Sequence, residues 1–334
     1  MRRTSIILIF FATICGIRVL AQAPATAGPA RGTLVLDGGR AEGFIRRAAG
    51  FFPANAGALP DSATCSPHRP LDPELSRLCR IATNRSDVID KFVELAGGSG
   101  ARIVVIPTAW NDKFDDGSAA VTPDHLQRLR IGVQKTMGVD RVTILHTRDR
   151  RQADSPEFVA PLKRATGVWI DGGNDANLWD AYLGTRVETE IKALLARGGV
   201  VAGSSAGAAI QGSLGLVFTI VDSPGGKTLR VDGTHMCFGL LTNSTVMPHW
   251  NQRDRPDLTP VVVAHPSVLG IGIDVGAAAI VQGNRLEVTG DGHVGIYDGK
   301  VHGDKSYYYL SPGDRFDLHT RSSTEVSITI DPLL

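Results

Sequence analysis

Residues 199–210 read Gly-Val-Val-Ala-Gly-Ser-Ser-Ala-Gly-Ala-Ala-Ile: an apolar run, a G-x-S-x-G pattern and then small, helix-compatible residues. A strand, a sharp turn and a helix in this order are typical of a nucleophile elbow, in which glycines leave room for the turn. The turn would expose the hydroxyl of Ser205 and aim the amide of Ala206 at a developing oxyanion. The same residues would also fit a Gly/Ser-rich loop at the start of a helix.

Upstream of this stretch, short apolar runs alternate with amphipathic segments. We predict buried strands at residues 33–36, 102–107, 142–145 and 167–170, and helices at residues 86–96, 123–137 and 187–197. Ser86 and the Thr122-Pro123 pair are typical of helix starts, and Gly97-Gly98 is typical of a helix end. Apolar strands that alternate with helices predict an α/β fold, a doubly wound, mainly parallel sheet with helices on both faces.

The sequence changes character on either side of this α/β core. After the elbow, β-rich pieces at residues 270–274, 278–282, 285–289 and 294–297 predict extra C-terminal strands that extend or edge the same sheet. Residues 40–85 are rich in Pro, Arg and Ala and lack regular periodicity, which indicates an insertion after the first strand. We therefore expect residues 24–334 to form a single α/β domain with an insertion at about 40–85.

The first residues resemble a secretory signal peptide. Arg2 and Arg3 precede an apolar stretch at residues 6–14 that suits a signal core and is too short to span a bilayer, and small residues follow it. We expect a signal peptide at residues 1–23 and a secreted or periplasmic protein, with an uncleaved anchor as the alternative. No later run is apolar for long enough to give a stable membrane span.

Charge and cysteine content narrow the choice of partners. A net charge of +1 without a run of Lys and Arg argues against nucleic acid. Cys65 and Cys79 flank a short loop, and an oxidising compartment would favour a disulfide between them. Cys237 lies among apolar residues, so we expect it to be a buried free thiol. No spacing of His and Cys suggests a metal site, and the sequence leaves a homodimer open.

A serine nucleophile needs a base, and His249 is the best candidate among nine histidines. It follows a β-like run in the segment 246–253 (VMPHWNQR), where Pro248 would stiffen the backbone on its N-terminal side. A histidine next to a tryptophan is also typical of a packed structural residue. Both interpretations of His249 stay open on these residues alone.

Taken together, six segments resemble peptidase family S51, the group of the cyanophycinases and α-aspartyl dipeptidases. In chain order they are the Gly38-Gly39 turn, ARIVVIP at 101–107, Gly172-Gly173-Asn174 with Leu178, the elbow at 203–208, HWNQRDR at 249–255 and LGIGID at 269–274. The last two are closest to cyanophycinase, whose histidine segment has the pattern HFxxRxR. The matches extend over most of the chain from Gly32 onward outside the insertion.

The resemblance implies a glutamine amidotransferase-like (flavodoxin-like) α/β sandwich with Ser205 as nucleophile and His249 as base. It also implies an oxyanion hole made by the amide of Ala206 and an amide of the 172–174 turn, for which we take Gly173. Such a turn can bring backbone N–H groups close to a substrate, and it would also fit a plain strand-to-helix connection. Acyl-enzyme chemistry of this kind needs no metal or organic cofactor.

We expect the substrate to be contacted from the same two segments. Asn174 and Asp175 follow the glycine turn, and Gln252, Arg253 and Arg255 follow the candidate base. Asp175 stands where the family has a glutamine. Two arginines in one segment suit a clamp for substrate carboxylates, and they would also suit a solvated loop.

The group that orients the histidine is the main departure from the family. Cyanophycinases carry a glutamate after GIGID, and the corresponding residue here is Val275. Asp274 would point to the opposite face if the strand continues. Asp222 lies between the serine and the histidine in sequence, where the dipeptidases carry their acid, so we take Asp222 as the candidate third catalytic residue. It would also fit a turn before residues 223–226 (SPGG).

These residues support three interpretations of function. The first, which we favour, is an exported cyanophycinase-like serine peptidase that hydrolyses peptide bonds at aspartyl or β-aspartyl-arginine units. The second is a catalytically impaired relative that binds a peptide or carboxylate ligand, and Val275 is its main support. The third is an esterase or amidase of the α/β-hydrolase class, whose histidine normally lies much further downstream than His249.

Overall fold

The computed structural model describes residues 27–41, 87–113, 121–224 and 226–325. The predicted signal peptide at 1–23, nearly all of the predicted insertion and the predicted Cys65–Cys79 disulfide lie outside these residues. Among the described residues, no helix combines the length and the apolar character that crossing a bilayer requires.

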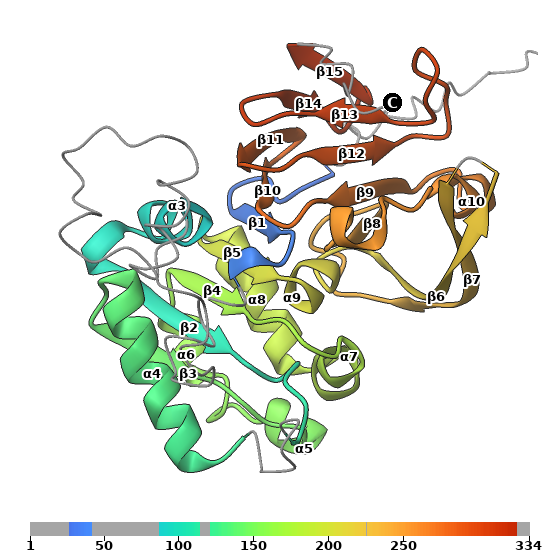
Figure 1. The fold of residues 1–334 in the computed structure, drawn as a ribbon. Coiled ribbons are helices and arrows are strands. Elements are labelled where there is room, and N and C mark those ends of the chain that lie inside the picture. Colours follow the sequence, from blue (N-terminus) through green and yellow to red (C-terminus); the bar gives the residue numbers. More distant parts are fainter. Residues whose placement is uncertain (1–26, 42–86, 114–120, 225, 326–334) are drawn as a thin grey trace, which may run out of the picture.

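The described chain contains a nine-stranded central sheet, in the order β15-β14-β11-β10-β1-β5-β4-β2-β3 (Figure 1). Its parallel half consists of β1 (Thr33–Asp37), β5 (Val200–Ser204), β4 (Gly167–Ile170), β2 (Arg102–Ile106) and β3 (Arg141–Ile144). The antiparallel half consists of β10 (Ala277–Gln282), β11 (Arg285–Gly290), β14 (Arg315–Asp317) and β15 (Ser322–Glu325). In such sheets, ligands bind beyond the carboxyl ends of the parallel strands.

Helices cover both faces of the parallel half. On one face lie α3 (Asp87–Leu95) and α4 (Pro123–Met137), and on the other lie α6 (Ala160–Arg164), α7 (Ala176–Tyr182) and α8 (Arg186–Ala196), with α5 (Arg150–Ala153) near α7. Successive strand residues point to opposite faces, so Leu34 and Leu36 join one apolar cluster and Val35 joins the other. The doubly wound fold predicted from the sequence is confirmed.

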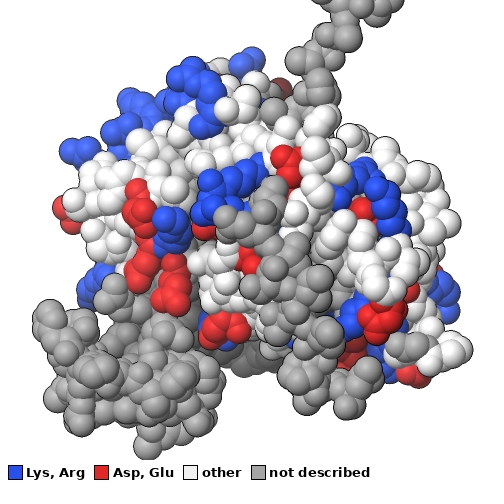
Figure 2. Space-filling model, turned by 90° about the horizontal axis from the view of Figure 1, so that it is seen from above, with Lys and Arg blue, Asp and Glu red and all other residues white. Residues whose placement is uncertain are grey.

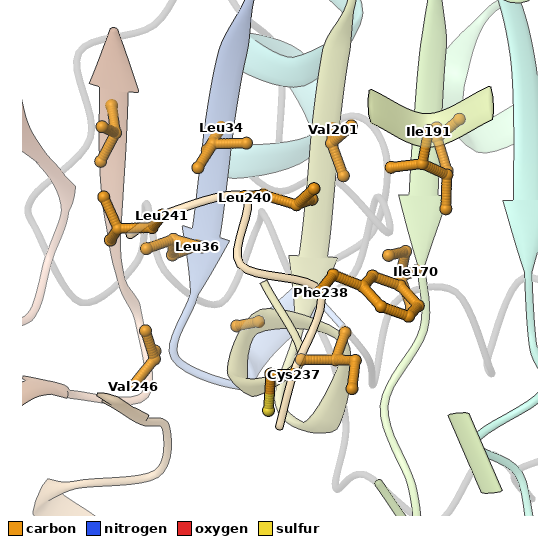
Figure 3. Packing of buried hydrophobic residues seen from close by; sticks show 14 of the residues in the cluster. Leu34, Leu36, Ile170, Ile191, Val201, Cys237, Phe238, Leu240, Leu241 and Val246 are labelled. Carbon is orange, nitrogen blue, oxygen red and sulfur yellow. The ribbon is translucent and has the colours of Figure 1, made fainter. Parts of the chain in front are cut away.

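The larger apolar cluster lies beneath the elbow (Figure 3). Side chains of β1, β4 and β5 meet Ile191 of α8 and a segment without regular structure, residues 237–241. Backbone bonds from Phe238 N to the carbonyl of Ile210 (2.9 Å) and from Leu241 N to that of Gln211 (2.9 Å) fix this segment. It carries Cys237, which is a buried free thiol as predicted.

A second sheet of four strands lies beside the first, in the order β13-β12-β9-β8. Its strands are β8 (Ser244–Met247), β9 (Leu269–Ile273), β12 (Val294–Tyr297) and β13 (Tyr308–Leu310), and α10 (Thr259–Ala264) connects β8 with β9. The fully buried Trp250 fills the space against Gly272 and Gly295. A Cβ atom on Gly272 would come within 2.6 Å of the indole, so only glycine leaves room for the ring.

The β-rich C-terminal pieces therefore divide between two sheets. Those at 278–282 and 285–289 extend the central sheet as predicted, in β10 and β11. The prediction was wrong for 270–274 and 294–297, which form β9 and β12 of the second sheet. The physical reason is Trp250, whose ring occupies the surface that the glycines of these strands leave open.

A long hairpin leaves the elbow helix α9 (Ala206–Ala209) and was not predicted from the sequence. It consists of β6 (Leu214–Ser223) and β7 (Gly226–Met236), which pair only with each other among the strands described. Most residues of its strands are half-buried or exposed, and only Gly215 and Leu229 are buried. On the face of the molecule shown in Figure 2, Lys and Arg side chains are interspersed with Asp and Glu.

Candidate active site

Ser205 lies on a sharp turn between β5 and α9. Its backbone has φ 54° and ψ −120°, a conformation that stores strain in a non-glycine residue. A Cβ atom on Gly203 would collide with the carbonyl of Gly207, and one on Gly207 would collide with that of Ile170. The glycines of the G-x-S-x-G pattern thus allow the close approach that the elbow requires.

His249 lies opposite this serine. Its Nε2 atom is 2.9 Å from Ser205 Oγ, so the two predicted residues form a hydrogen-bonded pair. The histidine backbone is fixed by its own N–H, which donates to the carbonyl of Gly38 (2.8 Å), and by Trp250 N, which donates to Ile273 (3.0 Å). The Gly38-Gly39 turn and β9 therefore position the imidazole together.

Gln252 holds the other nitrogen of the ring. Its Oε1 atom lies 3.0 Å from His249 Nδ1. Because an amide oxygen can only accept, this contact places the proton on Nδ1 and leaves Nε2 free to accept from Ser205. Gln252, which we expected to contact substrate, thus occupies the position that a carboxylate takes in a triad. It lies three positions after His249, and the 3₁₀ turn at Asn251–Arg253 brings the two side chains together.

Asp222 is not the third member of this group. It lies near the end of the hairpin with a side chain that is 91% exposed, and it pairs with Lys227 (2.5 Å). The hydrogen bond from Lys227 lowers the pKa of this carboxyl below 3.8. Asp222 is a residue of β6 just before the β6–β7 turn, opposite Lys227 of β7, so neither the catalytic role nor the turn position expected from the sequence is observed. Val275 also has another task, since its N–H donates to Asn251 Oδ1 (2.8 Å).

Gly173 and Ala206, the two predicted oxyanion donors, line the same cavity in front of Ser205. Within the described chain, neither Ala206 N nor Gly173 N donates to a protein acceptor. Gly173 has φ 141°, and a Cβ atom there would come within 2.6 Å of the carbonyl carbon of Ala109. Asn174 N donates to the carbonyl of Ala109 (2.7 Å), which fixes the turn. Among the described residues neither N–H group is thus occupied by a backbone acceptor, which the predicted role as oxyanion donors requires.

A cavity of about 470 Å³ lies in front of Ser205. It is bounded by the turn at 173–176, Trp179 of α7, residues 215–218 of β6, His235 of β7 and Arg253. Three of the residues expected to contact substrate, Asn174, Asp175 and Arg253, therefore line it.

Arg255 has a structural contact instead. Its guanidinium donates to Asp274 Oδ2 (2.9 Å) and lies over the rings of Trp250 (5.7 Å) and Tyr309 (5.3 Å). The carboxylate side chain of Asp274 is only 1% exposed, and a buried charge of this kind requires a partner. Arg255 therefore stabilises the segment that carries His249, and it does not line the cavity.

Asp37 was missed by the sequence analysis although it belongs to the site. It is fully buried, and its Oδ2 atom accepts from Ser204 Oγ (2.5 Å), Gly39 N (3.1 Å) and Ala41 N (3.0 Å). Its carbonyl accepts from Ser205 N (3.1 Å). Burial raises the pKa of Asp37 above 3.8, against these hydrogen bonds and the nearby His249. The sequence signal that could have identified Asp37 is an acidic residue at the carboxyl end of β1, directly before two glycines.

The chain is similar to known proteins in sequence and in fold. Residues 80–289 match the family model described as Peptidase family S51. The cyanophycinase of Nostoc sp. (strain PCC 7120 / SAG 25.82 / UTEX 2576) is 31% identical over 258 residues, 71% of this chain and 82% of the relative. The cyanophycinase of Geminocystis herdmanii (strain PCC 6308) is 27% identical over 238 residues, 70% of this chain and 82% of the relative.

The fold is similar to that in the crystal structure of a peptidase from an acI-B1 Actinobacterium. The TM-score is 0.56 at 21% identity, and the match covers 87% of this chain and 98% of the other. The family resemblance seen in the six sequence segments is thereby confirmed by a family match that spans more than half of the chain.

Proposed function

The chain belongs to peptidase family S51, and from this premise we propose that it is a cyanophycinase-like serine peptidase that cleaves peptide bonds at aspartyl or β-aspartyl-arginine units. The observation that carries the proposal is the 2.9 Å contact between Ser205 Oγ and His249 Nε2 beside a cavity of substrate size. A relative that merely binds ligands would not need this pair, and the contact favours the enzyme over it.

The reaction begins with attack of Ser205 Oγ on the carbonyl carbon of the scissile bond, while the hydroxyl proton passes to His249 Nε2. The amides of Ala206 and Gly173 donate to the oxyanion. His249 then gives its proton to the leaving amine, which departs and leaves an acyl-enzyme. A water molecule, deprotonated by the same nitrogen, attacks the ester and releases the acid and the free serine.

Gln252 makes this pair different from a triad with a carboxylate. Its carbonyl fixes the tautomer and the ring orientation of His249, as the asparagine does in papain-like Cys-His-Asn sites. It carries no charge, so it stabilises the imidazolium less than a carboxylate would. We therefore propose that His249 acts as a general base, with a lower turnover rate than a carboxylate partner would give.

We also propose that the protein is exported. The support is the order of basic, apolar and small residues near the N-terminus. Sequencing the N-terminus of protein recovered from the periplasm or medium tests this proposal, and a start between Ala21 and Ala27 is expected.

The activity is tested with purified mature protein, cyanophycin and aspartyl dipeptides, with identification of the products by mass spectrometry. A serine-reactive fluorophosphonate should label Ser205, and peptide mapping should distinguish it from the neighbouring Ser204. Ser205→Ala removes only the hydroxyl that bonds His249 and should abolish both labelling and turnover. A folded wild-type protein that is neither labelled nor active on any of these peptides would leave the ligand-binding interpretation.

A further inference from the structure

A carboxyl group is buried beneath the turn on which His249 packs. Asp37 ends β1 without solvent exposure, and its Oδ2 atom accepts from Ser204 Oγ (2.5 Å), Gly39 N (3.1 Å) and Ala41 N (3.0 Å). Within the described residues its Oδ1 atom has no hydrogen-bond partner, and the carboxyl group forms no ion pair. A buried carboxylate in this state costs free energy, so its presence calls for an explanation.

The local structure does not require the charge. Asp37 accepts from backbone N–H groups two and four positions ahead, and both aspartate and asparagine stabilise turns in this way. An asparagine would accept the same bonds with its carbonyl oxygen and would avoid the cost of a buried carboxylate. The negative charge at this position is therefore explained only by a group that it stabilises.

His249 is a group that the charge can stabilise. Its ring packs on Gly39, where an added Cβ atom would overlap it, and its own N–H donates to the carbonyl of Gly38 (2.8 Å). Because Gly39 N bonds the carboxyl group, the backbone of Gly39 lies between the imidazole and Asp37. The attraction to His249 opposes the effect of burial on the pKa of Asp37. In a site of low dielectric such an attraction is stronger than in water.

The other groups around this turn are either paired or uncharged. The charged ones pair with one another: Arg40 with Asp291 (2.6 Å), and both Arg255 (2.9 Å) and His293 (3.6 Å) with Asp274. The residues opposite Asp37 on the neighbouring strands are Ala278 of β10 and Ser204 of β5. The buried residues of α3 and α9, which pack near β1, are apolar. Asp37 therefore acts on His249 without another unpaired charge between them.

We propose that Asp37 is a positioning residue for His249 and supplies, from beneath the Gly38-Gly39 turn, the negative charge that Gln252 lacks. Gln252 fixes the tautomer, and ionised Asp37 stabilises the imidazolium that forms when Ser205 gives up its proton. The Asp37 carbonyl also accepts from Ser205 N (3.1 Å), so one residue holds the nucleophile and supports the base. This inference rests on the proposed function, since it assigns the counter-charge of the same Ser-His pair.

Kinetics and melting curves of Asp37→Asn test the charge while an acceptor is kept. The ratio of wild-type to Asp37→Asn kcat should be close to one at a pH where the carboxyl is protonated. It should rise to about tenfold or more once Asp37 ionises, because a nearby opposite charge changes proton affinity by about one pH unit or more. Over the same pH range the melting temperature of the variant should increase relative to wild type, because the variant buries no charge. A merely structural residue would lose activity and stability together.

Two further variants make this test specific. Ser204→Ala removes a donor that lowers the pKa of Asp37, so the rise of kcat with ionisation of Asp37 should move to higher pH. Asp298→Asn removes another buried carboxylate, which bonds His302 (2.8 Å) after β12 and does not line the cavity. Its kcat relative to wild type should not change with pH. A ratio for Asp37→Asn that is independent of pH, or a parallel loss of stability and activity, would overturn the inference.

A measurement on the ring itself separates this inference from the proposed function. In the Ser205→Ala protein, the proton resonance at Cε1 of His249, assigned with His249→Asn, reports protonation of the ring without turnover. Asp37→Asn should move the titration midpoint of this resonance to lower pH by about one unit or more. An unchanged midpoint would contradict the inference even in an active enzyme. The expected shift in a protein that cleaves none of the peptides would overturn only the catalytic proposal.

Discussion

The imidazole of His249 lies directly against the backbone of Gly39, so close that a Cβ atom there would come within 2.6 Å of Nε2. Gly39 has φ 128°, and its N–H donates to the buried Asp37. The surface against which the His249 ring packs is therefore bare backbone, and a side chain at position 39 would push the ring out of place.

Gly39→Ala should displace the imidazole and lower kcat/KM by about 10²-fold, because a shift of about 1 Å in a catalytic group has that effect. Gly97→Ala is the matched control. Its backbone is also left-handed, with φ 111°, but no atom lies within 4 Å of the added Cβ, so it tests backbone strain alone. Steady-state kinetics and melting curves of both variants check the prediction, and full activity of Gly39→Ala would contradict it.

The turnover rate should depend both on a hydrogen-bond acceptor at position 252 and on the charge of that acceptor. Gln252→Leu removes the acceptor at Nδ1 and should lower kcat by about 10²-fold or more, because the tautomer is no longer fixed. Gln252→Glu should raise kcat above the wild-type value and move the acid limb of the kcat/KM profile to higher pH. The cause is the carboxylate, which holds the proton on the imidazole more strongly.

Asp222→Asn is the control for these variants, because it removes an exposed carboxylate that pairs with Lys227. Its kcat and pH profile should match the wild type. A large loss of activity in Asp222→Asn, with Gln252→Leu unaffected, would return Asp222 to the role predicted from the sequence.

Asp37 should make stability depend on pH. Burial raises its pKa in the folded state above the unfolded value of 3.8, so the folded protein binds more protons between these two pKa values. The contribution of Asp37 to stability is then fully present below pH 3.8 and is lost as the pH rises through the folded pKa. Asp37→Asn keeps an acceptor for Ser204 and removes the ionisation.

The melting temperature of Asp37→Asn relative to wild type should therefore increase as the pH rises above about 4. Thermal melts of both proteins across the acidic to neutral range measure this difference. A constant difference at all pH values would show that Asp37 titrates alike in both states.

Cys237 should be protected from alkylation in the folded protein. Burial raises the pKa of this thiol to about 12, so very little of it is present as the reactive thiolate at pH 8. Iodoacetamide should modify Cys237 orders of magnitude faster in denaturant than in buffer, followed by mass spectrometry of the peptide. Equal rates in both conditions would show that the reagent reaches the thiol in the folded protein, through the cavity that Cys237 lines or by opening of the segment at 237–241.

The α/β core could be predicted from the sequence because the apolar pattern of each strand or helix is visible within its own residues. Residues 167–170 and 123–137 show this, since their bounds agree with β4 and α4 as observed. The hairpin β6–β7 could not be recognised, because neither of its faces is fully buried and its polar residues give no clear alternation. The assignment of β9 and β10 to different sheets could not be recognised either. It goes with the packing of Trp250 against Gly272 and Gly295, a contact between residues that are distant in the sequence.

The Ser205–His249 pair could be predicted for a similar reason, since the glycine spacing around Ser205 and the segment around His249 are local signals. The orienting residue could not. Asp222 was chosen for its place in the chain order, whereas contact with Nδ1 depends on a 3₁₀ turn and a positive φ of 54° at His249. Asp37 was missed because its contacts form only when β1 pairs with β5 and β10, which are distant from it in the sequence.

The first strand of the fold lies between β5 on one side and β10 on the other, and Gly38 N donates to the carbonyl of Ala277 (3.0 Å). When Ser205 has just been synthesised, its hydrogen-bond partner His249 has not. The β10 residue Ala277, which bonds the Gly38 turn, is also still missing. His249 and β10 both belong to the last third of the sequence, so the Ser205–His249 pair can form only after most of the chain has been synthesised.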